Sequence, residues 1–176
     1  MSDPILFFGV LLLCLVALWF FGAFDEQGDT KFEIRLADGS LRFKDDSLEI
    51  AFAFEPTEDL SELKHIPIAV ANKSASPLKV DWPSCVIVDP DGVARGLVCD
   101  LVPKPDAVVA PGSEIDELLI PRDRVGGMIS SRRGLLLIDW AGEESFTFKL
   151  RLKVTVDGAP KPLELKFKAA RVVPAA

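Results

Sequence analysis

Residue types that carry much of protein chemistry are scarce in this 176-residue chain, which has no tyrosine, one histidine and three cysteines. A closed zinc site needs about four cysteine or histidine ligands, and these counts leave too few of them. His65, the single histidine, precedes a strand-like segment, and no serine or cysteine in a nucleophile motif accompanies it. We therefore predict a protein that is not an enzyme and that has no catalytic residue, no metal site and no cofactor.

Charge is absent from residues 5–24, whose sequence is ILFFGVLLLCLVALWFFGAF. A helix of this length, at about 1.5 Å per residue, spans about 30 Å and matches the hydrocarbon core of a bilayer. A helix that is apolar on every side is buried in lipid or in protein. The run predicts a transmembrane anchor over residues 1–24, with aromatic rings at the headgroup boundary: Trp19, Phe20, Phe21 and Phe24.

A cleaved signal peptide is the alternative interpretation of this run. It calls for a basic start and a small-x-small cleavage site. The chain starts Met-Ser-Asp-Pro, and Phe21 stands two residues before Ala23, where a small residue belongs. These residues favour retention of the helix.

The remainder of the chain is acidic. All 20 Lys and Arg lie after the helix with 26 of the 27 Asp and Glu, so this part carries 20 − 26 = −6. Because such a surface repels phosphate backbones, nucleic acid is not an expected partner. No motif for a small-molecule substrate is evident either.

Apolar residues recur with a period of two from Lys31 onward, which predicts β-strands rather than helices. The clearest case is a hairpin over residues 146–168 with one wet, basic face. Its predicted core residues are Phe148, Leu150, Leu152, Val154, Leu165 and Phe167. A turn is expected over residues 157–160, and Lys153 opposite Glu164 is one possible pair. Helical signal is confined to residues 57–63, so an all-β domain is predicted over 31–176, after a linker at 25–30.

A second hairpin is predicted from residues 85–88 and 93–98, around Asp89-Pro90-Asp91-Gly92. Cys85 then faces a residue near 96, and Cys99 is displaced by about 10 Å, too far for a disulfide. Two buried free thiols are expected. Asp89 and Asp91 also suggest a calcium loop, but Val93-Ala94-Arg95 supplies no further oxygen ligand, so a Pro-Asp-Gly turn is preferred.

Four segments within about 50 residues share a pattern of turn chemistry: Ile68-Ala-Val-Ala-Asn-Lys-Ser, Pro77-Leu-Lys-Val-Asp-Trp82, Asp89-Pro-Asp-Gly92 and Ala110-Pro-Gly-Ser113. This pattern resembles that of the immunoglobulin-like domains of bacterial membrane-anchored envelope proteins. The resemblance implies an all-β, immunoglobulin-like β-sandwich, preceded here by the single N-terminal transmembrane helix, and a domain outside the cytoplasm.

The charges beside the helix favour the opposite side. Lys31, Arg35, Arg42 and Lys44 follow the helix and no Lys or Arg precedes it, which by the positive-inside rule indicates a cytoplasmic domain. On the basis of the resemblance, we expect a single-pass protein of the cell membrane with an extracytoplasmic or periplasmic domain.

One cluster of arginines stands out from the acidic domain. It lies between Pro121 and a predicted strand at 135–138, and Trp140 follows that strand. A solvated loop explains the charges. The functional alternative is contact with an acidic partner or with lipid phosphates, through Arg122, Arg124, Arg132, Arg133 and Trp140.

These features together predict a non-enzymatic accessory or scaffolding subunit. One helix anchors it in the lipid bilayer, and its domain docks on an integral membrane protein complex. The alternative is a ligand-binding or adhesion module that is free on the envelope surface.

Overall fold

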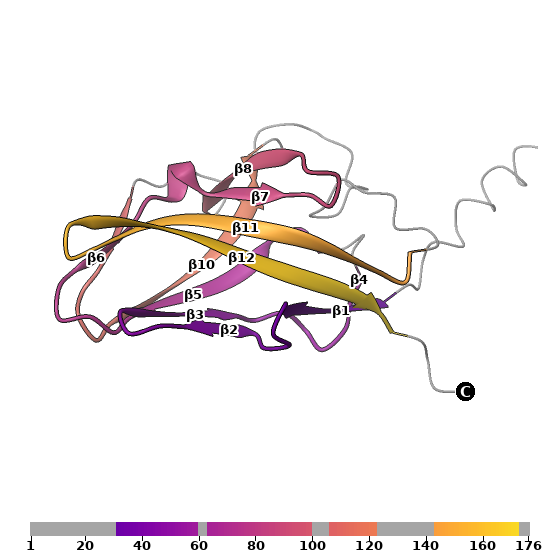
Figure 1. Ribbon diagram of the computed structural model, residues 1–176, viewed down its shortest axis with the longest axis horizontal. Helices are drawn as coiled ribbons and strands as arrows, with labels where there is room; N and C mark the ends of the chain where they lie inside the picture. The colour runs from indigo at the N-terminus through magenta and orange to yellow at the C-terminus, as the bar shows by residue number, and fades with distance from the viewer. Residues whose placement is uncertain (1–30, 60–62, 100–105, 123–142, 173–176) are drawn as a thin grey trace, which may run out of the picture. The chain divides into compact units, whose positions relative to one another are not determined.

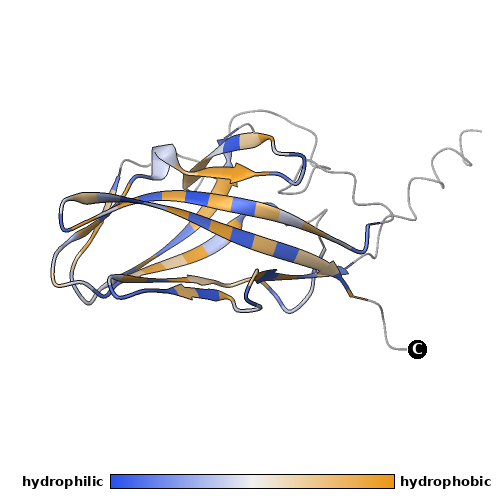
Figure 2. Cartoon of the chain, viewed as in Figure 1, coloured by the Kyte–Doolittle hydropathy of each residue, from blue (hydrophilic) through white to orange (hydrophobic). Residues whose placement is uncertain are grey.

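Two long antiparallel strands dominate the structure, a computed structural model that describes residues 31–59, 63–99, 106–122 and 143–172. Strand β11 (Ser145–Val156) pairs with β12 (Ala159–Arg171) over its whole length. The six residues predicted as core in this hairpin are each at most 4% exposed. Their outward neighbours are polar, and the alternation appears as bands along both strands (Figure 2). The predicted hairpin is confirmed.

The turn of this hairpin is tighter than the sequence indicated. Asp157 and Gly158 alone form it, with φ of 51° and 77°, and such a left-handed pair matches the twist of the flanking strands. Pro160 and Pro162 therefore belong to β12. A strand tolerates proline where the missing N–H faces an unpaired edge, and β1 pairs with β12 only from residue 167 onward.

The described part of the chain is all-β apart from a short 3-10 turn, η2 (Trp82–Ser84). The other strands are β1 (Lys31–Leu36), β2 (Arg42–Lys44), β3 (Leu48–Phe52), β4 (Glu58–Asp59), β5 (Ile66–Asn72), β6 (Leu78–Val80), β7 (Val86–Val88), β8 (Ala94–Cys99), β9 (Ala107–Val109) and β10 (Glu114–Pro121).

These strands form two sheets that are joined at one strand (Figure 1). Sheet A has the order β4-β1-β12-β11-β7, with β6 also paired to β11 and β9 to β6. Sheet B has the order β2-β3-β5-β10. The first half of β8 pairs with β7 and its second half with β10, so one continuous sheet curls almost into a barrel.

The core lies between the two sheets. Phe167 of β12 stacks on Phe148 of β11, with ring centroids 4.9 Å apart, and meets the ring of Phe52 of β3 edge-on at 4.8 Å. Phe54, just beyond β3, also meets Phe167 edge-on. Because Phe52 belongs to sheet B, this cluster of rings connects the sheets, and such pairs stabilise a core beyond simple burial.

One expectation about local structure is wrong, and one register that the sequence left open differs from the pair named as possible. Residues 58 and 59 do not begin a helical turn but pair with β1 as β4. Glu164 lies opposite Arg151, not Lys153, since the two-residue turn sets a different register.

Several predictions lie outside the described residues: the transmembrane helix at 5–24, the linker at 25–30 and the strand at 135–138. The chain divides into two compact units, Met1–Thr30 and Lys31–Ala176, and the described residues all belong to the second. None of the described segments is a helix long and apolar enough to cross a membrane.

The contrast between adjacent residues of β12 gives a test of this fold. Phe167→Ala should lower the free energy of unfolding by about 3–5 kcal/mol, because it empties the centre of the ring cluster. Lys168→Ala should change it by less than about 0.5 kcal/mol, since that side chain is in water. Urea unfolding of the two variants measures both values, and equal losses would mean a register shifted by one residue.

Candidate binding surfaces

Arg122 is the one predicted partner contact within the described residues. It follows β10, and its Nη2 donates a hydrogen bond to the Pro83 carbonyl at 3.3 Å. Its guanidinium lies 3.7 Å from where a Cβ on Gly96 would stand, so it packs across the β7–β8 hairpin although it is exposed. The other predicted contacts lie outside the described residues: Arg124, Arg132, Arg133, Trp140, Trp19, Phe20, Phe21 and Phe24.

Six basic side chains gather on the outer surface of sheet A, and we call this surface the basic face. The predicted wet face of the hairpin provides five of them, and β1 adds the sixth, because Arg35 pairs with Lys168. Three acidic residues form ion pairs with them: Glu33 with Arg35, Glu164 with Lys149 and Arg151, and Asp81 with Lys153 at 3.2 Å. The members of the basic face are Arg35, Lys149, Arg151, Lys153, Lys166 and Lys168.

The ion pairs of the basic face leave it with surplus positive charge. Glu164 accepts hydrogen bonds from Lys149 at 2.7 Å and from Arg151 at 2.8 Å, and these hold the pKa of its carboxyl below the usual range. Lys166 lies directly opposite Lys149. Neither Lys166 nor Lys168 forms an ion pair with another described residue. Like charges that face each other across strands destabilise a sheet.

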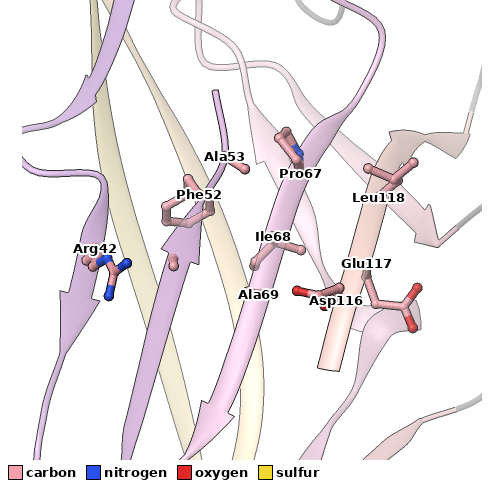
Figure 3. Close-up of a pocket in the computed structure, with 10 residues that line it drawn as sticks. Arg42, Phe52, Ala53, Pro67, Ile68, Ala69, Asp116, Glu117 and Leu118 are labelled. Atoms are coloured by element: carbon pink, nitrogen blue, oxygen red, sulfur yellow. The ribbon is translucent and has the colours of Figure 1, made fainter. Parts of the chain in front are cut away.

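The outer surface of sheet B has a different chemistry. Ala51 of β3 pairs with Ala69 of β5, and Ala53 follows with its N–H bonded to the carbonyl of Pro67. These four small residues form the floor of a shallow hollow with a volume of about 420 Å³, which we call the alanine trough (Figure 3).

The walls of the alanine trough come from the strands on either side. Arg42 of β2 pairs with Ala51, and Asp116 of β10 pairs with Ala69, so one cross-strand row runs from a cation to an anion over two alanines. Leu118, which is 39% exposed, extends the apolar surface on the β10 side. Arg42 also forms an ion pair within the domain, because its Nη1 lies 3.1 Å from Oε1 of Glu49.

The β7–β8 hairpin carries a buried ion pair. Arg95 donates from Nε and Nη2 to the two carboxylate oxygens of Asp89, each at 2.9 Å, and the two side chains are 8% and 1% exposed. The backbone of Asp89 closes the turn, and Gly92 supplies its φ of +87°. The Pro-Asp-Gly turn is confirmed. Because Arg95 occupies both oxygens of Asp89, this carboxylate is not arranged for calcium.

The cysteines and the histidine that the sequence analysis considered do not come together in one site. Cys85 and Cys99 are both buried and are not joined in a disulfide, as expected, and burial raises the pKa of the Cys85 thiol to about 11. His65 is half-buried just before β5. Within the described ranges, no three His, Cys, Asp or Glu side chains gather as a metal site would require.

Comparison with known proteins gives no match to a family model, to a curated protein or to a solved structure.

The buried ion pair allows a test of how the β7–β8 hairpin is held. Arg95→Met should lower the free energy of unfolding by about 3–5 kcal/mol, because it leaves the Asp89 carboxylate buried without a counter-charge. Arg151→Met removes a similar contact at 2.8 Å to Glu164, but from half-exposed side chains, and should cost about 1 kcal/mol or less. The double variant Asp89→Leu/Arg95→Met should cost less than Arg95→Met alone. Denaturant unfolding of the three variants measures this, and a double variant worse than the single one would contradict it.

Proposed function

We propose that this chain is a non-enzymatic accessory subunit of a larger membrane protein assembly. In this proposal the N-terminal helix over residues 1–24 anchors the chain in the bilayer. The β domain is an immunoglobulin-like sandwich that docks on the partner, and the Arg122–Arg133 loop with Trp140 provides further contacts. Two sheets around one core support the sandwich, and the apolar sequence of residues 5–24 supports the anchor.

The observation that carries docking is the alanine trough. The outer surface of a β-sandwich is usually polar along each strand, because inward apolar residues alternate with outward polar ones. Here the two middle strands of sheet B turn Ala51, Ala53, Pro67 and Ala69 outward instead. Small side chains let a partner's backbone approach closely and lose almost no rotamer entropy when they are covered.

The shape and charge of the trough indicate the kind of surface that fits it. An apolar ridge, such as one face of a helix, would cover the floor and Leu118. Basic groups on that ridge would meet Asp116, and acidic groups would meet Arg42. Water leaves this floor on docking, whereas a transmembrane helix gains little hydrophobic energy when it moves from lipid to protein. The domain therefore supplies most of the specificity.

A free ligand-binding module is the alternative. Pockets for small molecules are usually concave, with a few polar groups converging on the ligand. The alanine trough is shallow and open, and its charged residues stand at its two walls rather than over its floor (Figure 3). These features favour a protein ridge over a small molecule.

Recovery of the tagged full chain from mild detergent tests the proposal. The natural chain should bring stoichiometric partners with it. Ala51→Gln/Ala69→Gln should reduce their recovery about tenfold, which corresponds to a loss of about 1.4 kcal/mol of binding free energy. Thr147→Gln/Thr155→Gln places the same side chains on the outer surface of sheet A and serves as the matched control, with recovery unchanged.

Two outcomes would contradict the proposal in different ways. A natural chain recovered alone would mean that it is not a subunit and would favour the free module. Partners retained by the folded trough variant would mean that docking uses another surface, with the Arg122–Arg133 loop the first to test by charge reversal.

A further inference from the structure

We propose that the basic face binds the anionic headgroups of the bilayer that carries the chain, so that sheet A lies against the membrane. This contact goes beyond docking on a partner and rests on the proposed function only for the membrane anchor. It uses the outer surface of sheet A, whereas the alanine trough belongs to the outer surface of sheet B.

The first argument is that the basic face holds more positive charge than the ion pairs of the domain use: Lys166 and Lys168 form no ion pair with another described residue. Two pairs of like charges stand directly opposite each other, Lys149 with Lys166 and Arg35 with Lys168. Each such pair is unfavourable in a sheet. Neutral residues fit outward positions of the same strand, as Thr147 and Thr155 do. A chain of net charge −7 thus concentrates six cations on one surface, where three carboxylates form ion pairs with them.

The composition of the face favours lipid over an acidic protein. Protein interfaces are enriched in aromatic residues and arginine at their centres and depleted in lysine. Four of the six cations here are lysines, and the outward positions of β11 and β12 hold no aromatic residue. A fluid layer of phosphates demands no fixed geometry, and it attracts each lysine within a Debye length, about 10 Å at 0.1 M salt.

The dimensions of the face suit several headgroups at once. Its charges occupy four successive cross-strand rows, from Lys153 opposite Pro162 to Thr147 opposite Lys168. These rows cover about 20 Å along the strands at about 3.3 Å per residue. Only residues 25–30 separate the predicted helix from β1, and six residues reach about 20 Å at most. Such a short tether keeps the effective concentration of headgroups at the domain high.

The test uses the full chain in bilayer nanodiscs that contain a lipid with a headgroup-bound nickel chelate. A spin label is attached at Thr147→Cys on the outer surface of sheet A, or at Ala51→Cys on that of sheet B, with Cys14→Ala as background. Cys85 and Cys99 are buried and do not compete for the label. The measurement is the relaxation enhancement of each label by nickel, in discs of phosphatidylglycerol mixed with phosphatidylcholine and in discs of phosphatidylcholine alone.

We expect stronger enhancement at 147 than at 51 in the anionic discs. The difference should disappear in neutral discs, and also between about 0.1 M and 1 M salt, which shortens the Debye length from about 10 Å to about 3 Å. Lys149→Gln/Lys166→Gln/Lys168→Gln should abolish it. The matched control Lys44→Gln/Lys64→Gln/Lys73→Gln removes the same charge from residues that are not members of the basic face and should preserve the difference.

Equal enhancement at 147 and 51 in anionic discs would overturn the proposal and leave the basic face to an acidic protein. Loss of the difference between positions 147 and 51 in both triple variants would also overturn the proposal. Such a result would mean that the contact depends on the net charge of the domain and not on the basic face. Co-elution of the chain with the discs is recorded in every case. A chain that does not co-elute refutes the anchor, and with it the proposed function, rather than the lipid contact alone.

Discussion

Burial of alternate residues along the β11–β12 hairpin is the constraint on which the rest of the domain depends. The hairpin pairs with β1 on one side and with β6 and β7 on the other, and its Phe167 reaches Phe52 in the opposite sheet. Strand side chains alternate strictly between faces, so burying Phe148, Leu150 and Leu152 turns Lys149, Arg151 and Lys153 outward. One register therefore sets both the core and the charged surface.

Much of the fold was predictable because its signals are local. Period-two alternation located the long hairpin, and Asp89-Pro90-Asp91-Gly92 located the turn between β7 and β8. The errors arose where the local structure depends on pairing between strands and not on the local sequence alone. Residues 58 and 59 read as helical, yet β1 offers them an edge to pair with. The exact turn at Asp157 and Gly158, and hence the partner of Glu164, depends on which two residues adopt positive φ.

The candidate surfaces were less accessible to sequence reasoning. The basic side of the hairpin was visible in the alternation, but Arg35 joins it only because β1 pairs with β12, more than 130 positions later. The alanine trough depends on β3, β5 and β10 lying side by side in the right register. Isolated alanines carry no signal in a sequence. The sequence did not indicate the ion pair between Arg95 and Asp89, because only the β7–β8 hairpin brings the two side chains together.

The central claim is that β1 and β12 place their charges together on one face, and a cross-strand disulfide tests it directly. Directly paired strand residues have Cα atoms about 4.5–5.5 Å apart, within the range that a disulfide spans. Arg35→Cys/Lys168→Cys should therefore oxidise readily within the folded chain. The offset pair Arg35→Cys/Lys166→Cys lies about 7–8 Å apart and should oxidise far more slowly. Faster oxidation of the offset pair than of the direct pair would contradict the register that creates the basic face. Failure of both pairs to oxidise would contradict it as well.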